Sequence, residues 1–254
     1  MADWTADLAT RTRPRPMLEK MGSSERLDAG SEGSGRSAMR ERNYRQYCGL
    51  ASALDAVGDR WTLLVVRELL LGPRRYVELQ ADLPGIGTNL LAARLKKLRE
   101  LGLVRRAGHA PHSYDLTAEG ERMRDSVLAL SRFGMGLLTD PTADVVVRPH
   151  WGFLAVAAMA DADRLPELSE AYEFRVDDEV FHLAVRDGHA RPARGPAPAP
   201  ALVATTDATT FVQIGAGLID PMDAVAANRL TLTGDPAAAV RCSVVLGLTK
   251  APQA

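Results

Sequence analysis

Cysteine is almost absent from this sequence, which has only Cys48 and Cys242 among 254 residues. Two cysteines cannot build a disulfide framework or a cysteine-rich zinc site, and such scarcity is typical of a reducing compartment. Long apolar runs are absent as well, because none approaches the roughly 20 residues that cross a bilayer. The first residues also lack the basic and then apolar pattern of a signal peptide. We therefore expect a cytoplasmic protein that is neither secreted nor inserted in a membrane.

Short motifs of catalysis and cofactor binding are missing too. The sequence has no Gly-x-Ser-x-Gly or His-Glu-x-x-His motif and no Walker or Rossmann glycine loop. His109 and His112 are three residues apart, but no third metal ligand accompanies them in their turn. Phosphate contact or plain exposure explains this pair better than a metal does. We predict no catalytic residue, no metal and no cofactor, and hence a protein that is not an enzyme.

Charge and composition divide the chain into three parts. Residues 1–43 are rich in Arg, Ser, Gly and Pro, have little to bury and carry a net charge of +1, which predicts a disordered tail. Residues 44–140 carry a net charge of +3, and residues 141–254 carry −5. A basic region joined to an acidic one is consistent with a nucleic-acid-binding domain followed by a separate second domain.

The stretch from Val77 to Leu116 has the pattern of a helix-turn-helix followed by a wing. A short helix over 77–82 runs into the turn 83–87, which contains Pro and Gly, and Thr88 supplies a capping oxygen for the next helix. Leucines recur at helical spacing along one side of this second helix, and they predict its buried face. These leucines are Leu90, Leu91, Leu95, Leu98 and Leu101.

Two strand-like runs follow at 103–106 and 113–116, and the Gly- and Pro-containing turn between them predicts a wing. In such motifs the second helix enters the major groove of DNA, and the wing meets neighbouring phosphates. Asn89 is placed to read adenine, and Ala92 or Ala93 to meet a thymine methyl group. The predicted DNA contacts are Thr88, Asn89, Ala92, Ala93, Arg94, Lys96, Arg74, Arg75, Arg105, Arg106 and His109. Plain solvent exposure is the alternative, since helix-turn-helix shapes also occur in proteins that bind no DNA.

Helices flank this motif on both sides. Before it, Leu50, Leu54 and Val57 form one apolar helical face. After it, Thr117 caps a helix predicted to run to about Leu138, roughly 30 Å long. An a/d-like stripe on this helix comprises Met123, Val127, Leu130, Gly134 and Leu137. We expect the stripe to form a homodimer seam, with packing against the second domain as the alternative, and we expect Gly134 and Gly136 to mark a possible bend.

Strand-like and helix-like segments alternate in residues 141–254, so that the whole chain is assigned to the α+β class. The expected segments are a helix at 151–160, a hairpin of strands 171–176 and 179–186, a Pro/Ala loop at 191–200 and a strand at 201–205. Two helices that begin at Asp207 and Pro221, a strand at 229–233 and a helix at 237–248 complete the set. Asp235 is expected to cap the last helix, with Pro236 at its first position.

The N-terminal part of this pattern carries a family resemblance. The segments concerned are Tyr47-Cys48-Gly49-Leu50, Ala53-Leu54-Asp55-Ala56-Val57-Gly58-Asp59-Arg60-Trp61-Thr62-Leu63-Leu64, Arg67-Glu68-Leu69-Leu70, Gly72-Pro73-Arg74-Arg75-Tyr76, Leu83-Pro84-Gly85-Ile86, Arg94-Leu95, Leu98, Gly102-Leu103-Val104 and Tyr114-Asp115-Leu116-Thr117-Ala118-Glu119-Gly120. They resemble HxlR-type winged-helix transcriptional regulators. The resemblance implies a homodimeric prokaryotic repressor or activator. Such a dimer would require an inverted repeat in double-stranded DNA. Because the second helix departs from the family by starting Gly87-Thr88-Asn89 and carrying Ala92-Ala93, the operator sequence does not transfer.

A second resemblance covers the C-terminal part. The runs 204–211, 217–221 and 230–235 are similar to those of sterol carrier protein-like domains, which hold an apolar ligand between a sheet and helices. This resemblance implies an apolar effector, with Phe174, Phe181, Phe211, Ile214, Leu218, Met222 and Val244 as pocket-lining candidates. Ordinary core packing is the alternative for each of them. We expect a ligand-responsive regulator, and the alternative is a lipid carrier whose winged helix serves only protein contact.

Cys48 matches a cysteine that many HxlR-type proteins carry, and some of those proteins sense oxidants through it. A redox role requires an exposed thiol with a lowered pKa. No other cysteine is near Cys48 in the sequence, so such a switch would have to join two subunits. The alternative, which we favour on general grounds, is a small buried apolar residue.

Overall fold

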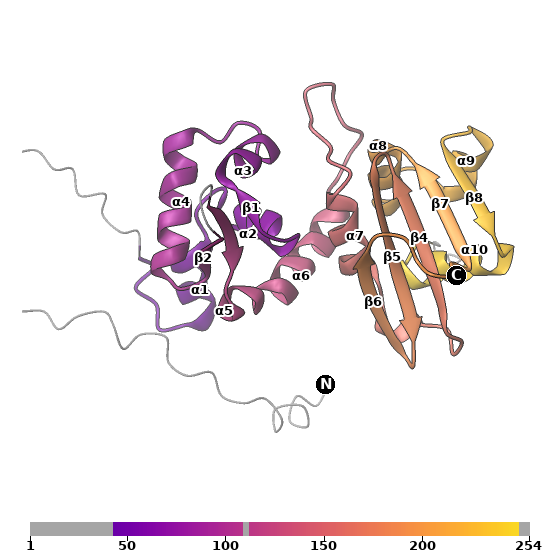
Figure 1. Cartoon of the computed structure of the whole chain (residues 1–254), viewed down its shortest axis with the longest axis horizontal. Coiled ribbons are helices and arrows are strands. Elements are labelled where there is room, and N and C mark those ends of the chain that lie inside the picture. Colours follow the sequence, from indigo (N-terminus) through magenta and orange to yellow (C-terminus); the bar gives the residue numbers. More distant parts are fainter. Residues whose placement is uncertain (1–42, 109–111, 249–254) are drawn as a thin grey trace, which may run out of the picture. The chain divides into compact units, whose positions relative to one another are not determined.

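The computed structural model describes residues 43–108 and 112–248 (Figure 1). Two hydrophobic clusters organise these residues. We call α1 to α6 with β1 to β3 the winged-helix module, and α7 to α10 with β4 to β8 the sheet module. Of the predicted tail 1–43, all but Asn43 lies outside the described residues. Within the described ranges, no helix is both long enough and apolar enough to cross a membrane.

The winged-helix module contains the predicted helix-turn-helix and wing. Its helices are α1 (Gly49–Val57), α2 (Thr62–Leu70), α3 (Tyr76–Asp82), α4 (Thr88–Glu100), α5 (Ala118–Glu121) and α6 (Arg124–Met135). Its strands are β1 (Arg74–Arg75), β2 (Val104–Ala107) and β3 (Ser113–Leu116), which pair antiparallel in the order β1-β3-β2. The helix-turn-helix is α3 and α4, and the wing is β2 and β3.

The turn before α4 depends on a glycine. Gly85 has a φ of 88°, a left-handed conformation that glycine adopts without strain, and a Cβ added there would lie 3.7 Å from the Trp61 ring. Leu91, Leu95 and Leu98 are buried, as their spacing predicts. Thr88 does not cap α4, because Gly87 occupies the N-cap position and Thr88 is the first helical residue. That expectation was wrong by one position.

The predicted continuous helix over 118–138 is two helices. The Thr117 hydroxyl accepts a hydrogen bond from the Gly120 N–H at 3.1 Å and caps the single turn of α5. The same hydroxyl donates to the Gly102 carbonyl at 2.6 Å, and a Cβ on Gly120 would lie 2.1 Å from the Leu103 carbonyl oxygen. These contacts hold α5 against the end of α4, so α6 starts separately. It ends at Met135 with Gly136 as its C-cap, so Gly136 marks the end of the helix, whereas Gly134 lies within its last turn.

The sheet module begins with α7 (Trp151–Met159) and a 3₁₀ turn, Ala162–Arg164. The strands are β4 (Glu170–Val176), β5 (Glu179–Arg186), β6 (His189–Arg194), β7 (Leu202–Thr206) and β8 (Leu230–Gly234). The remaining helices are α8 (Ala208–Gly215), α9 (Pro221–Ala226) and α10 (Pro236–Val245), the last capped by Asp235 as predicted. The sheet order is β6-β5-β4-β7-β8, with β4 and β7 parallel and the other neighbours antiparallel.

The predicted loop at 191–200 is wrong in its first part, where the chain forms β6. This strand lies at the edge of the sheet and pairs only with β5, and Pro192 stands opposite Leu183. Proline is tolerated there because an edge strand has N–H groups that need no partner in the sheet. The Pro and Ala content therefore marked an edge strand, which the composition did not distinguish from a loop.

Helix α7 belongs to both hydrophobic clusters. Leu154 is buried in the cluster of the winged-helix module, whereas Val156 is buried in the cluster of the sheet module. Residues two apart on a helix point to nearly opposite sides. The predicted boundary at 140/141 remains a prediction, and the structure adds that the first helix after it completes both cores.

Candidate nucleic-acid interface and ligand cavity

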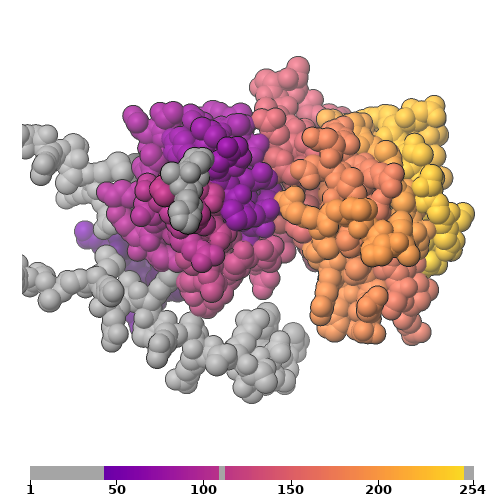
Figure 2. All heavy atoms as spheres, in the orientation of Figure 1, coloured from indigo at the N-terminus to yellow at the C-terminus, as the bar shows by residue number. Residues whose placement is uncertain are grey.

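One face of α4 is solvent-exposed along its length, and Figure 2 shows this helix at the molecular surface. The exposed residues of this face are Thr88, Asn89, Ala92, Ala93 and Lys96. Thr88 and Asn89 are polar and lie at the N-terminal end of the helix, and Ala92 and Ala93 are small. Lys96 is a cation whose side chain is 76% exposed. Small residues let a backbone approach a groove closely, while the polar ones can reach base edges and phosphates. The opposite face consists of buried leucines, so α4 presents this surface rigidly.

Arg94 differs from the rest of the predicted set. Its side chain is only 15% exposed, with Nη1 3.2 Å from Asp59 Oδ2 and Nε donating to the Arg60 carbonyl at 3.2 Å. Lys97 Nζ also reaches Asp59, at 3.1 Å. Both cations therefore tie α4 to the turn between α1 and α2. This corrects the prediction for Arg94, which braces α4 instead of extending toward a groove.

The other predicted cations occupy several different settings. Arg106 is exposed on β2, and Arg105 beside it is paired with Asp115 at 2.7 Å. Arg75 is the N-cap residue of α3, and its guanidinium binds Glu78 at 2.6 Å, which lowers the pKa of that carboxyl group. Arg74 is partly buried, and its Nε has no hydrogen-bond partner among the described residues. His109 lies outside the described residues.

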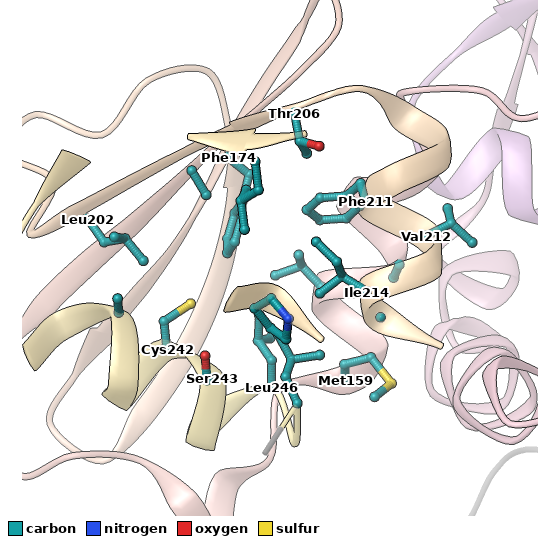
Figure 3. A pocket seen from close by; sticks show the side chains of 18 of the residues that line it. Met159, Phe174, Leu202, Thr206, Phe211, Val212, Ile214, Cys242, Ser243 and Leu246 are labelled. Carbon is teal, nitrogen blue, oxygen red and sulfur yellow. The ribbon is translucent and has the colours of Figure 1, made fainter. Parts of the chain in front are cut away.

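An apolar cavity of about 80 Å³ lies between the sheet and the helices of the sheet module, and Met135 at the end of α6 also lines it. Figure 3 shows Phe174 and Phe211 on one side of it, and Cys242 and Leu246 from the end of the chain on the other. No charged side chain is among the described residues that line it, which are Met135, Ala155, Val156, Met159, Phe174, Leu202, Ala204, Thr206, Phe211, Val212, Ile214, Gly215, Pro221, Leu230, Leu232, Ala239, Cys242, Ser243, Leu246 and Leu248. The Thr206 hydroxyl is already engaged, because it donates to the Arg229 carbonyl at 2.8 Å. Such a space suits an uncharged apolar molecule.

Three of the seven predicted pocket residues, Phe174, Phe211 and Ile214, line this cavity. Phe181 is buried behind the residues that line the cavity. The centroid of its ring is 5.6 Å from that of Phe174 and 5.8 Å from that of Phe211. The other three are exposed outside the cavity: Leu218, Met222 and Val244. Met222 and Val244 lie on the outer sides of α9 and α10, so their selection as pocket residues is corrected. An apolar residue on an amphipathic helix does not reveal which side faces a sheet until the packing is known.

Comparison with known proteins identifies the region around α4. A family model described as HxlR-like helix-turn-helix matches residues 56–141. A helix-turn-helix-type transcriptional regulator of Synechocystis sp. is 31% identical over 101 residues, which are 38% of this chain and 75% of that protein. This chain belongs to the HxlR-like helix-turn-helix family.

Two further proteins are similar to this chain. A helix-turn-helix-type transcriptional regulator of Mycobacterium tuberculosis is 36% identical over 102 residues, 39% of this chain. The chain spans 64% of the length of that relative. The crystal structure of a possible HxlR family transcriptional factor from Thermoplasma volcanium GSS1 matches at 28% identity and a TM-score of 0.31, covering 34% of this chain and 80% of that one.

Cys48 is exposed in this HxlR-like chain, contrary to the buried position that we favoured. It is the N-cap residue of α1, and backbone hydrogen bonds from Ala51 and Leu50 lower the pKa of its thiol. Cys242, by contrast, is buried in the cavity wall, where desolvation raises the pKa of its thiol.

Sequence reasoning missed a buried polar cluster centred on Glu68 of α2. The Glu68 side chain is fully buried, and its Oε1 accepts hydrogen bonds from Trp151 Nε1 at 2.9 Å and from Arg67 Nε at 2.9 Å. His150 Nε2 lies 3.1 Å from the other oxygen, Oε2. Burial by itself raises the pKa of Glu68, but the bonds from His150 and Arg67 outweigh it, and the pKa is lowered. Glu68, Asp82 and His150 could together ligate a cation, but Arg67 already occupies one oxygen of this cluster.

Proposed function

We propose that this protein is a DNA-binding transcriptional regulator that reads double-stranded DNA with α4. The observation that carries the proposal is the exposed face of α4, which has polar, small and cationic side chains in sequence and a fully packed leucine face behind it. Tyr76 supports the geometry, since its hydroxyl donates to the Thr88 carbonyl at 2.7 Å and positions the start of the helix. Arg105 and Arg106 on the wing would add phosphate contacts.

We infer that the regulator works as a homodimer. Leu130, Phe133 and Leu137 are exposed on α6 and just beyond it, although Val127 of the predicted stripe is buried in the winged-helix core. A second copy would cover these apolar side chains, and a two-fold dimer requires an inverted repeat with half-sites about 34–36 Å apart. Light scattering of Phe133→Asp should show monomer, whereas Val240→Asp, an equally exposed residue on α10, should leave a dimer. Dimeric Phe133→Asp protein would contradict this seam.

The DNA proposal is tested with the full chain and its own upstream region. Fluorescence anisotropy should give tighter binding to that region than to random duplex of equal length, at the same salt concentration. Asn89→Ala should reduce the ratio of specific to random binding, because its amide is the side chain placed to read a base. Equal affinity for the two duplexes would reject specific regulation and favour the lipid-carrier alternative.

The cavity supports an uncharged apolar effector. Among residues 43–108 and 112–248, no arginine, lysine or histidine lines it to neutralise an anionic head group, and an unpaired charge there would be costly. At about 80 Å³ it is smaller than the roughly 150 Å³ that accommodates benzene, so an effector of useful size has to displace lining side chains. The sterol carrier-like resemblance agrees with this ligand class.

Native mass spectrometry of the purified protein, and titration with the uncharged fluorescent probe N-phenyl-1-naphthylamine, test the effector site. Phe211→Trp should weaken probe binding by crowding the cavity. Met222→Trp should not, since Met222 is 65% exposed outside the cavity. Absence of any copurifying ligand together with identical probe binding by the two variants would reject a ligand site here.

Redox sensing through Cys48 is the second candidate. Its exposure and the lowered pKa of its thiol favour it over the buried alternative. Because Cys242 is buried, an oxidised Cys48 would pair with the same residue of another subunit. Non-reducing electrophoresis after diamide treatment should give a covalent dimer that Cys48→Ser cannot form, and DNA affinity that is unaltered by diamide would exclude a regulatory role.

A further inference from the structure

Helix α7 connects the cavity to the winged-helix core. Ala155, Val156 and Met159 line the cavity, whereas Leu154 is buried in the cluster that also contains the buried residues of α2 and α4. A ligand larger than the existing space must displace lining groups, and three of these belong to α7. A displacement of α7 would therefore change the packing of both hydrophobic clusters.

The N-terminal end of α7 is held by Glu68. Trp151, its first residue, donates from its indole N–H to Glu68 Oε1 at 2.9 Å, and the Arg67 guanidinium stacks over the Trp151 ring at 4.1 Å. His150 contacts the second oxygen of the same carboxylate. A buried carboxylate whose partners move away leaves a charge unpaired, which is strongly unfavourable. These contacts therefore resist small displacements of α7 and transmit larger ones.

Glu68 in turn belongs to the helix that supports the DNA-facing surface. It is followed by Leu69 and preceded by Val65 and Val66, all buried on α2, and α2 packs against both α3 and α4. The path from cavity to α4 thus consists of contacts that are all present in the structure. Other ties between the modules include Arg132 of α6, which donates to the carbonyls of Ala158 and Ala160 at the end of α7, and Arg194 of β6, which donates to the Leu71 carbonyl at 2.9 Å.

We propose that Glu68 is the positioning residue through which occupancy of the cavity reaches the winged helix. A ligand that shifts α7 changes the hydrogen bonds of Trp151 and His150 to this carboxylate, and α2 and α4 respond. The inference rests on the proposed ligand site and adds the contacts by which that site would act on the winged-helix module. A ligand can act in this way only through different affinities for the two arrangements, and each arrangement affects the ligand in return.

The test uses the full chain, N-phenyl-1-naphthylamine as probe, and deuterium uptake of α2 and α4 measured by mass spectrometry with and without probe. Glu68→Gln keeps the shape but removes the charge. Its matched control is Glu173→Gln, which alters another fully buried carboxylate, one that binds Arg175 and the Ala197 N–H within the sheet module. Trp151→Phe is a milder variant, for use if Glu68→Gln does not fold, since it removes one donor and keeps the ring.

In wild type and Glu173→Gln, the probe should change the deuterium uptake of α2 and α4. In Glu68→Gln that change should be lost, and the probe Kd should differ from wild type by about fivefold or more, the lower end of ordinary coupling. Unaltered probe Kd and an unaltered exchange response in Glu68→Gln would overturn the proposal, as would loss of the response in Arg132→Gln alone. Failure of the probe to bind wild type would instead reject the ligand site itself, and with it this route.

Discussion

Lys96→Ala measures whether α4 faces DNA. The Lys96 side chain is 76% exposed, and Glu100, its carboxylate neighbour, is exposed and 3.7 Å away, so their pairing contributes little and leaves the ammonium available to phosphate. Each phosphate contact adds about −0.9 to the slope of log K against log salt. A homodimer has two copies of Lys96, so the variant should reduce the magnitude of that slope by about 1.8. Between 50 and 200 mM salt, wild type should therefore lose about 12-fold more affinity than the variant.

The assay is fluorescence anisotropy at four salt concentrations with the upstream region and with random duplex. Lys96→Ala should weaken binding to both duplexes alike, because phosphate contacts carry no sequence information. Arg186→Ala is the matched control, since it removes an exposed cation at the end of β5 in the sheet module. A slope within about 0.5 of wild type for Lys96→Ala, or an equal reduction for Arg186→Ala, would refute the assignment of α4 as the DNA-contacting helix.

Three further predictions concern reactivity, packing and pH. Iodoacetamide should alkylate Cys48 in the native protein at a pH below that needed by an ordinary thiol, and it should reach Cys242 only after unfolding. Equal alkylation rates of the two cysteines in the native protein would contradict their different burial. Gly120→Ala should cost about 1–3 kcal/mol in urea unfolding, because its Cβ would overlap the Leu103 carbonyl oxygen, and wild-type stability would show that α5 can move away. The Arg241 guanidinium bound to Glu170 lowers the pKa of this carboxyl group. The contribution of Glu170 to stability is therefore complete above its unfolded-state pKa and is lost as the pH falls through its folded-state pKa. Urea unfolding of Glu170→Gln should therefore depend less steeply on pH in the acid range than that of wild type, and parallel curves would contradict this.

Local patterns were sufficient for most elements of the fold. The leucine spacing of α4, the Pro and Gly turn before it, the hairpin of β4 and β5, and the Asp235 cap of α10 were all predicted correctly. Each depends on residues within one or two turns of one another, where periodicity and capping chemistry act directly. Errors occurred where a distant segment decides the outcome, as in α5, which contacts the carbonyl groups after α4.

The sequence by itself therefore determined a helix-turn-helix with a wing, a second α+β part and the residue types on the exposed face of α4. Only the tertiary structure decided which charges remain exposed and which are paired. Arg94 forms an ion pair with Asp59, 35 positions earlier, and Glu68 contacts His150 and Trp151 more than 80 positions later. Nothing in the local sequence marks these partners, because an arginine or a glutamate on a helix has the same periodicity whether it faces water or a distant segment. Burial and pairing are properties of the packed chain. They decide which side chains are available to bind a partner and which instead support the fold.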